Sequence, residues 1–316
     1  MRRRALVLTA LLGLAVLPVT AAHSDTPEVW SVDLTGARTN VIIAGGSVRL
    51  ADPQLPQLAA PRATGSVVTA PHRLPTPVRA LSARIDADRP AGSTAQVDIR
   101  EQVQGHWSEW VPAGSAFPAP ATVVQARITL TAGAGAANPA VHAVDLVPSA
   151  TAAAAPPKPA GLVRSRVFAT REGLVGGTTA NGHVIVSRDH FVALPSRRGL
   201  ATKNTGDYTV RLCAENGRCE WAPVWDVGPW NTTDDYWSPA SVRESWKDLP
   251  QGMPQAQAAF ESQYNGGRDG FDRTVSNPAG IDLGDGVFWD GLKLTTNSWV
   301  DVAYLWTDDA RSPASS

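Results

Sequence analysis

The chain has 316 residues, with 28 Lys and Arg against 29 Asp and Glu, which gives a formal net charge of -1. Nucleic-acid binding rests on clustered Lys and Arg that neutralise phosphates. The sequence contains no basic block or stripe, so nucleic acid is excluded as an expected partner. It also lacks a phosphate-binding glycine loop, an H-E-x-x-H motif and a G-x-S-x-G motif. Its six His are scattered, so we expect no metal and no cofactor.

Residues 1–22 have the three parts of a secretory signal peptide. A positively charged start contains Arg2, Arg3 and Arg4, an apolar run spans 5–16, and small residues precede a cleavage site near Ala22. The apolar run is shorter than the ~20 residues that span a bilayer. We therefore expect a secreted protein without a membrane anchor. Cleavage leaves 25 basic against 29 acidic residues, a net charge of about -4.

Residues 149–160 form an Ala- and Pro-rich linker between two domains. In the first domain, residues 25–148, apolar and polar residues alternate over 95–100 and 124–130. A period of two places one set on a core face and the other in solvent. The pattern predicts an antiparallel β-sandwich that serves as an accessory domain.

The segment from His106 to Trp110, with the strand that follows it, resembles the jelly-roll modules joined to secreted cell-wall amidases and glycosidases. Two interpretations stay open for Trp107 and Trp110. Their rings either pack on a strand or stack on a glycan.

The second domain, residues 161–310, is also expected to be mostly β. The predicted strands are 164–170, 190–194, 208–214, 218–227, 280–283 and 299–306. An insertion of roughly fifty residues after the fourth strand contains two helix signals, at Pro239 and at Pro254, and the second helix is predicted to end at Gly266 and Gly267. Its aromatic content argues against disorder.

The two Cys residues flank a predicted hairpin turn at Asn216, with Gly217 available for a left-handed conformation. This register places Cys213 opposite Cys219, within bridging distance. An exported protein favours a disulfide. A metal-binding pair is the alternative, but no further Cys or His lies nearby in the sequence.

Three segments of the second domain follow one another in a recognisable order. They are Thr178-Thr179-Ala180-Asn181-Gly182, His190 to Pro195, and Asp226-Val227-Gly228-Pro229 with the later Ile281-Asp282-Leu283. Together they resemble the RlpA-like (rare lipoprotein A) double-psi β-barrel, a barrel shared with expansins. The resemblance covers roughly 165–306 and implies a six-stranded double-psi β-barrel that contacts cell-wall polysaccharide. Val227 and Gly284 depart from the family's Arg and Ser.

The resemblance implies that Asp226 and His190 cleave peptidoglycan glycan strands, as a lytic transglycosylase does. Breaking a glycosidic bond needs an acid that protonates the leaving oxygen, and burial can raise a carboxyl pKa for that role. A hydrolase needs a second carboxylate, for which Asp282 is the candidate. Structural roles remain open for all three residues, because an Asp before Gly-Pro often caps a turn.

Aromatic residues near Asp226 are candidates for substrate binding, because indole faces stack on the apolar faces of sugars. They are Trp225, Trp230, Tyr236 and Trp237, and Asp282 is a further candidate for substrate binding. The alternative is that they bury the insertion against the barrel. Overall we expect a monomer that binds peptidoglycan glycan strands, and the first hypothesis is that it also cleaves them. The alternative hypothesis is a non-catalytic, expansin-like polysaccharide-binding or wall-loosening module.

Overall fold

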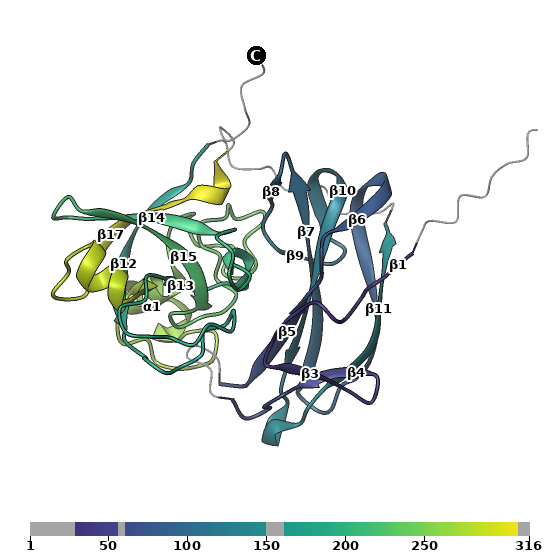
Figure 1. The fold of residues 1–316 in the computed structure, drawn as a ribbon. Helices are drawn as coiled ribbons and strands as arrows, with labels where there is room; N and C mark the ends of the chain where they lie inside the picture. Colours follow the sequence, from purple (N-terminus) through teal and green to yellow (C-terminus); the bar gives the residue numbers. More distant parts are fainter. Residues whose placement is uncertain (1–28, 56–60, 150–160, 309–316) are drawn as a thin grey trace, which may run out of the picture.

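The computed structural model describes residues 29–55, 61–149 and 161–308. The predicted signal peptide and residues 150–160 of the predicted linker lie outside these ranges. Two β-structures follow one another along the chain and lie side by side (Figure 1). No helix among the described residues is long and apolar enough to cross a membrane.

The first structure is an antiparallel assembly of eleven strands. Two long strands, β6 and β10, pair with each other and connect its two layers (Figure 1). The strands are β1 (Trp30–Ser31), β2 (Ala37–Thr39), β3 (Val41–Ala44), β4 (Ser47–Leu50), β5 (Thr64–Val68), β6 (His72–Asp88), β7 (Thr94–Val103), β8 (His106–Trp107), β9 (Val111–Pro112), β10 (Ala116–Thr131) and β11 (Ala140–Pro148). A single-turn helix (Ala134–Ala136) precedes β11.

The alternation predicted for this domain is present, but its polar face is not in solvent. Ile99 and Ile128 are fully buried in the sandwich core, as expected. Arg100 and Arg127, on the opposite face, are only 2% and 4% exposed. The prediction of a solvent face was wrong for these positions, because the second domain covers this face of β7 and β10.

The second structure is a closed barrel with the strand order β12-β16-β13-β15-β14-β17. Two pairs, β12–β16 and β13–β15, are parallel, and the other four are antiparallel. The strands are β12 (Arg164–Glu172), β13 (Val192–Leu194), β14 (Thr209–Ala214), β15 (Cys219–Val227), β16 (Ala279–Gly284) and β17 (Ser298–Tyr304). All six predicted strands are therefore confirmed. The predicted fold class, mostly β with a six-stranded barrel in the second domain, is confirmed as well.

The insertion between β15 and β16 contains one of the two predicted helices. Helix α1 (Gln255–Ser262) begins directly after Pro254, as predicted, but it ends before Gly266 because Gln263 is left-handed, with φ of 55°. At Pro239 the prediction was wrong: the chain makes only a turn, in which the amides of Val242 and Arg243 both donate to the Pro239 carbonyl. Short helical turns also occur at Arg197–Gly199, Tyr264–Gly267, Gly286–Gly291 (π-helical) and Leu305–Thr307.

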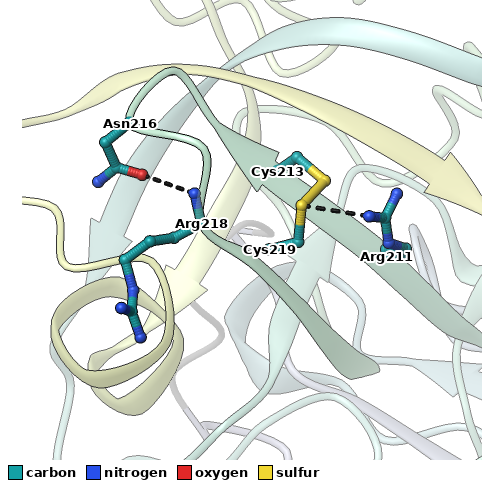
Figure 2. The surroundings of a disulfide bond; sticks show 5 residues. All are labelled: Arg211, Cys213, Asn216, Arg218 and Cys219. Atoms are coloured by element: carbon teal, nitrogen blue, oxygen red, sulfur yellow. Dashed lines mark hydrogen bonds between the residues drawn. A yellow bond between two sulfur atoms is a disulfide. The ribbon is translucent and has the colours of Figure 1, made fainter.

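The predicted disulfide is present and closes the β14–β15 hairpin (Figure 2). Cys213 lies directly opposite Cys219, and the S–S distance is 2.11 Å. Gly217 has the predicted positive φ, 81°. The Asn216 side chain accepts a hydrogen bond from the Arg218 amide at 3.0 Å, which fixes the turn.

Candidate functional site: a carboxyl cluster on the outer face of the barrel

Three acidic residues, Glu172, Asp226 and Asp282, gather on four neighbouring barrel strands. The register aligns Thr170 of β12 with Asp282 of β16, Asp282 with Ala193 of β13, and Ala193 with Asp226 of β15, and paired residues point to the same side of a sheet. At the end of β12 the alternation breaks, with Arg171 exposed and Glu172 buried close to Asp226. The small side chain of Ala193 separates the two Asp residues, whose Cα atoms lie two strand spacings apart, about 10 Å.

The inward-facing residues of the same strands explain why Asp282 points outward. Ala169, Leu194, Val224, Ile281 and Leu283 fill the barrel core and are fully buried. Because strand side chains alternate, the residues between them must face away from the core. A register shift in β13–β15 brings Asp226, instead of Trp225, opposite Ala193.

Asp226 is only 4% exposed and is held by backbone amides. Its Oδ1 accepts hydrogen bonds from the amides of Ala180 and Val227, each at 2.8 Å. The Ala180 amide belongs to the 179–182 turn, which covers the cluster. The backbone amide of Asn181 also holds this turn, because it donates a hydrogen bond to the Trp225 carbonyl at 3.1 Å.

Glu172 is the partner of Asp226, and the sequence reasoning missed it. The residue is 6% exposed, and both of its carboxyl oxygens, like Oδ2 of Asp226, are buried without a conventional donor among the described residues. Burial raises the pKa of Glu172 well above its ordinary value, and the charges of Asp226 and Asp282 raise it further. Burial and these neighbouring charges favour the protonated form of Glu172, which can donate a hydrogen bond to Asp226.

Burial also raises the pKa of Asp226, but the two amides, the hydrogen bond from Glu172 and the charge of Arg197 oppose that rise. Burial raises the pKa of Asp282 to about 7; a hydrogen bond donated by Thr170 opposes the rise, and the charge of Asp226 adds to it. The cluster thus combines three carboxyl groups with raised pKa values: Glu172, raised most strongly, Asp226, whose rise is opposed by hydrogen bonds, and Asp282, with a pKa of about 7. Such separated pKa values are typical of acid and base pairs in active sites.

His190 lies away from this cluster. It is an exposed residue whose Nδ1 pairs with Glu220, and its ring lies close to Gly286. Asp226 aligns with Ala193 on the neighbouring parallel strand. Because Ala193 lies three residues beyond His190, about 10 Å along the strand direction separates His190 from Asp226. The histidine closer to the covering turn is His183, whose Nε2 lies 2.7 Å from Asp189 and whose ring lies 4.4 Å from that of Trp225.

The four predicted aromatic residues have different environments. Trp225 is half-buried and stacks on Phe191 with ring centroids 5.6 Å apart. Trp230 is half-buried and donates its Nε1 to Asn277 at 3.2 Å. Tyr236 and Trp237 are 0% and 1% exposed, so neither offers a ring face to a ligand in solution.

Trp107 and Trp110 of the sandwich also serve packing. Arg100 lies over both rings, at 4.5 and 4.4 Å from their centroids, and Trp110 is 1% exposed. Among residues 29–55, 61–149 and 161–308, no group of three His, Cys, Asp or Glu side chains is arranged to hold a metal ion.

A signal for Glu172 was present in the sequence, directly after the strand predicted over 164–170. Extending that strand by two residues includes Glu172. Its proximity to Asp226 depends on the closure of the barrel, which the sequence pattern does not contain.

Comparison with known proteins gives one match. Residues 163–303 match a family model described as "Domain of unknown function (DUF8814)". The matched region runs from just before β12 into β17, so it contains the barrel, the insertion and all three carboxyl groups. No curated protein matches the chain.

Proposed function

We propose that the chain is a secreted, cell-wall-associated protein whose barrel binds and cleaves peptidoglycan glycan strands, with Glu172 as the proton donor and Asp226 as its ionised partner. The observation that carries this proposal is the buried pair of carboxyl groups, one with a strongly raised pKa and the other held by two amides. The resemblance to RlpA-like barrels supports the class of polymer. The disulfide supports export, because disulfides persist in oxidising compartments.

The chemistry needs one acid that later acts as a base. Glu172 gives its proton to the glycosidic oxygen as the bond from C1 to that oxygen breaks. The 6-hydroxyl of the same sugar then forms a bond to C1 and returns its proton to Glu172. The products are a shortened strand and a 1,6-anhydro end, and Glu172 is again protonated. Asp226 stabilises the positive charge that develops at C1.

The substrate reaches this pair only when the 179–182 turn moves. Its hydrogen bonds run from the Ala180 amide to Asp226, from the Asn181 amide to the Trp225 carbonyl, from the Thr39 hydroxyl to the Asn181 carbonyl at 3.0 Å and from Lys203 to the Gly182 carbonyl at 2.7 Å. These bonds must break when the turn moves. The flanking Leu174, Val175, Val184 and Val186 are each about half exposed. If the turn stays closed, the substrate does not reach the carboxyl groups. The alternative function, a binding module without catalysis, is then favoured.

Incubation with purified glycan strands that lack stem peptides tests the proposal. Mass spectrometry should detect 1,6-anhydro ends with wild type, and the Glu172→Gln and Asp226→Asn variants should lose at least about 100-fold of the rate, as is usual for a general acid. His190→Gln is the matched control and should retain activity. Saturable binding to sacculi without any cleavage product would leave only the binding module.

The chemical form of the product distinguishes two mechanisms. New reducing ends in place of 1,6-anhydro ends would indicate hydrolysis, with Asp282 as the second carboxylate. In that case Asp282→Asn should abolish the reaction, whereas a transglycosylase should tolerate this change.

A further inference from the structure

A second functional face lies on the barrel wall formed by β12, β17, β14 and β15. In one row of paired residues, Arg164 aligns with Ala303, Ala303 with Arg211, and Arg211 with Trp221. In the next row, Arg166 aligns with Asp301, Asp301 with Cys213, and Cys213 with Cys219. Side chains of aligned residues point to the same side. We call this surface the arginine face, defined by Arg164, Arg166, Arg211, Trp221 and Asp301.

The arginine face is hollowed and carries an indole open to solvent. A depression of about 390 Å³ is lined by Arg164, Ser165, Arg166, Arg211, Cys213, Asp301 and Val302. At the edge of the row, Trp221 is 59% exposed, the largest fraction among the large hydrophobic side chains of the described residues.

Two of the three guanidinium groups are positioned but not neutralised. Arg211 lies 5.4 Å from the centroid of the Trp221 ring, and it donates to the Cys219 sulfur at 3.3 Å (Figure 2). Arg166 pairs with Glu215, whereas within the described part of the chain neither Arg164 nor Arg211 forms an ion pair with a carboxylate. Three Arg against the two carboxylates Asp301 and Glu215 give this surface a net charge of +1, on a chain whose formal net charge is -1.

The face is also rigid, since it consists of strands and not of loops. The disulfide joins β14 to β15 directly beside Arg211 (Figure 2). A preorganised site loses little conformational entropy when it binds a ligand. Aromatic rings stack on the apolar faces of sugars, and guanidinium groups form paired hydrogen bonds with carboxylate, sulfate or phosphate oxygens.

We propose that the arginine face is a binding site for an acidic glycan. Trp221 stacks on a sugar ring, and Arg164 and Arg211 bind the acidic substituent. The site is separate from the carboxyl cluster: Arg164 and Glu172 are at opposite ends of β12, about 26 Å apart along the strand. It holds an acidic polymer on the barrel whether or not the carboxyl cluster is catalytic.

Isothermal titration calorimetry on residues 23–316 tests the proposal with three probes of similar length. These are a carboxylated oligogalacturonate, a sulfated heparin oligosaccharide and a neutral cello-oligosaccharide. We expect an acidic probe to bind at least about tenfold more tightly than the neutral one, and its affinity to fall with added salt. A preference for oligogalacturonate identifies a carboxylate ligand, and a preference for heparin identifies a sulfate- or phosphate-like group.

Variants locate the binding. Trp221→Ala and Arg164→Gln should each weaken acidic binding by about tenfold. Phe260→Ala and Arg38→Gln, which change an exposed aromatic and an exposed Arg elsewhere, are matched controls and should bind as wild type. Thermal unfolding checks that each variant is folded.

Three results would overturn the proposal: equal affinity for neutral and acidic probes, wild-type affinity in both Trp221→Ala and Arg164→Gln, or no binding of any probe. Glu172→Gln should bind the acidic probes normally. Loss of glycan cleavage and loss of acidic binding are therefore separable, and each proposal can fail without the other.

Discussion

The carboxyl groups of Glu172, Asp226 and Asp282 lie close together, yet their environments differ. Asp226 receives two amide hydrogen bonds, Asp282 receives one from the Thr170 hydroxyl, and Glu172 receives none from a conventional donor among the described residues. Hydrogen bonds favour the ionised form and burial disfavours it. The protonated form is therefore favoured most at Glu172, and for this reason we assign the proposed acid to it.

Replacing Asp282 with Asn should change how stability depends on pH. The folded pKa of Asp282, about 7, lies above its ordinary value of 3.8, so the folded state binds more protons between these limits. Stability of the wild type is fully present below pH 3.8 and falls as the pH rises toward 7. Asp282→Asn lacks this loss. The difference in free energy of unfolding, variant minus wild type, should therefore be larger at pH 8 than at pH 4 by about 2 to 4 kcal/mol.

Urea unfolding of both proteins between pH 4 and pH 8 measures this effect. Asp86→Asn, which changes an exposed Asp of β6, is the control and should follow the wild-type pH dependence. Parallel stability profiles for Asp282→Asn and wild type would show that Asp282 is ionised throughout this range.

At the scale of elements, the barrel wall presents different chemistry on different strands. The strands β12, β16, β13 and β15 carry the carboxyl cluster, whereas β12, β17, β14 and β15 carry the arginine face. Asp282 and the arginine face use the outward half of the alternation, because the inward half forms one apolar core. A closed barrel has no free edges, so its outer wall is a rigid support for both sites.

The disulfide contributes to the rigidity of the β14–β15 hairpin. It closes a loop with a sequence separation of 6 residues. For so short a loop, the loss of unfolded-state entropy stabilises the protein by about 2 kcal/mol. The Cys213→Ser/Cys219→Ser double variant should therefore unfold with a free energy lower by that amount.

Urea titrations with and without dithiothreitol provide the measurement. The wild type should lose stability on reduction, and the double variant should be insensitive to dithiothreitol. If the wild type is equally stable with and without dithiothreitol, the disulfide does not stabilise the protein, and strand pairing alone holds the hairpin.

The two domains share a polar interface that buries charged residues. Arg100 of β7 bonds to Asp207 at 3.0 Å and to the Gln125 amide oxygen at 2.6 Å. Glu109 accepts hydrogen bonds from the indoles of Trp237, at 2.7 Å, and Trp306. Trp110 and Val68 of the sandwich belong to the same apolar cluster as the barrel core. This continuity predicts that the two domains unfold together.

Arg100→Ala tests that expectation, because it leaves Asp207 and Gln125 without their partner. Loss of one member of a buried ion pair costs about 3 to 5 kcal/mol. Differential scanning calorimetry should show one transition for wild type and a lower Tm for the variant. Arg84→Ala, at an exposed position of β6, is the control and should leave the Tm within about 1 °C of the wild-type value. Two separate wild-type transitions would mean that the domains are thermodynamically independent.

The sequence by itself determined the elements with local causes. Alternation with a period of two predicted the strands, the Asn216–Gly217 turn predicted the register of the hairpin and its disulfide, and Pro254 marked the start of α1. These depend on residues close in the chain. The failure at Pro239 has another origin: Val242, Trp246 and Leu249 keep a helical spacing, but Arg243 is buried against Asp234 and donates to the Met253 carbonyl, contacts that the local pattern does not encode.

The tertiary structure alone decided which residues meet. Glu172 lies close to Asp226 because the closed barrel brings the end of β12 near the end of β15, a proximity that no local pattern encodes. His190 lies beside Glu220 for the same reason. Arg100 and Trp237 follow patterns that suggest a solvent face and a ligand platform, but each is buried where the two domains pack. Burial and charge proximity arise from contacts between distant segments, and they set the pKa values on which the proposed chemistry depends.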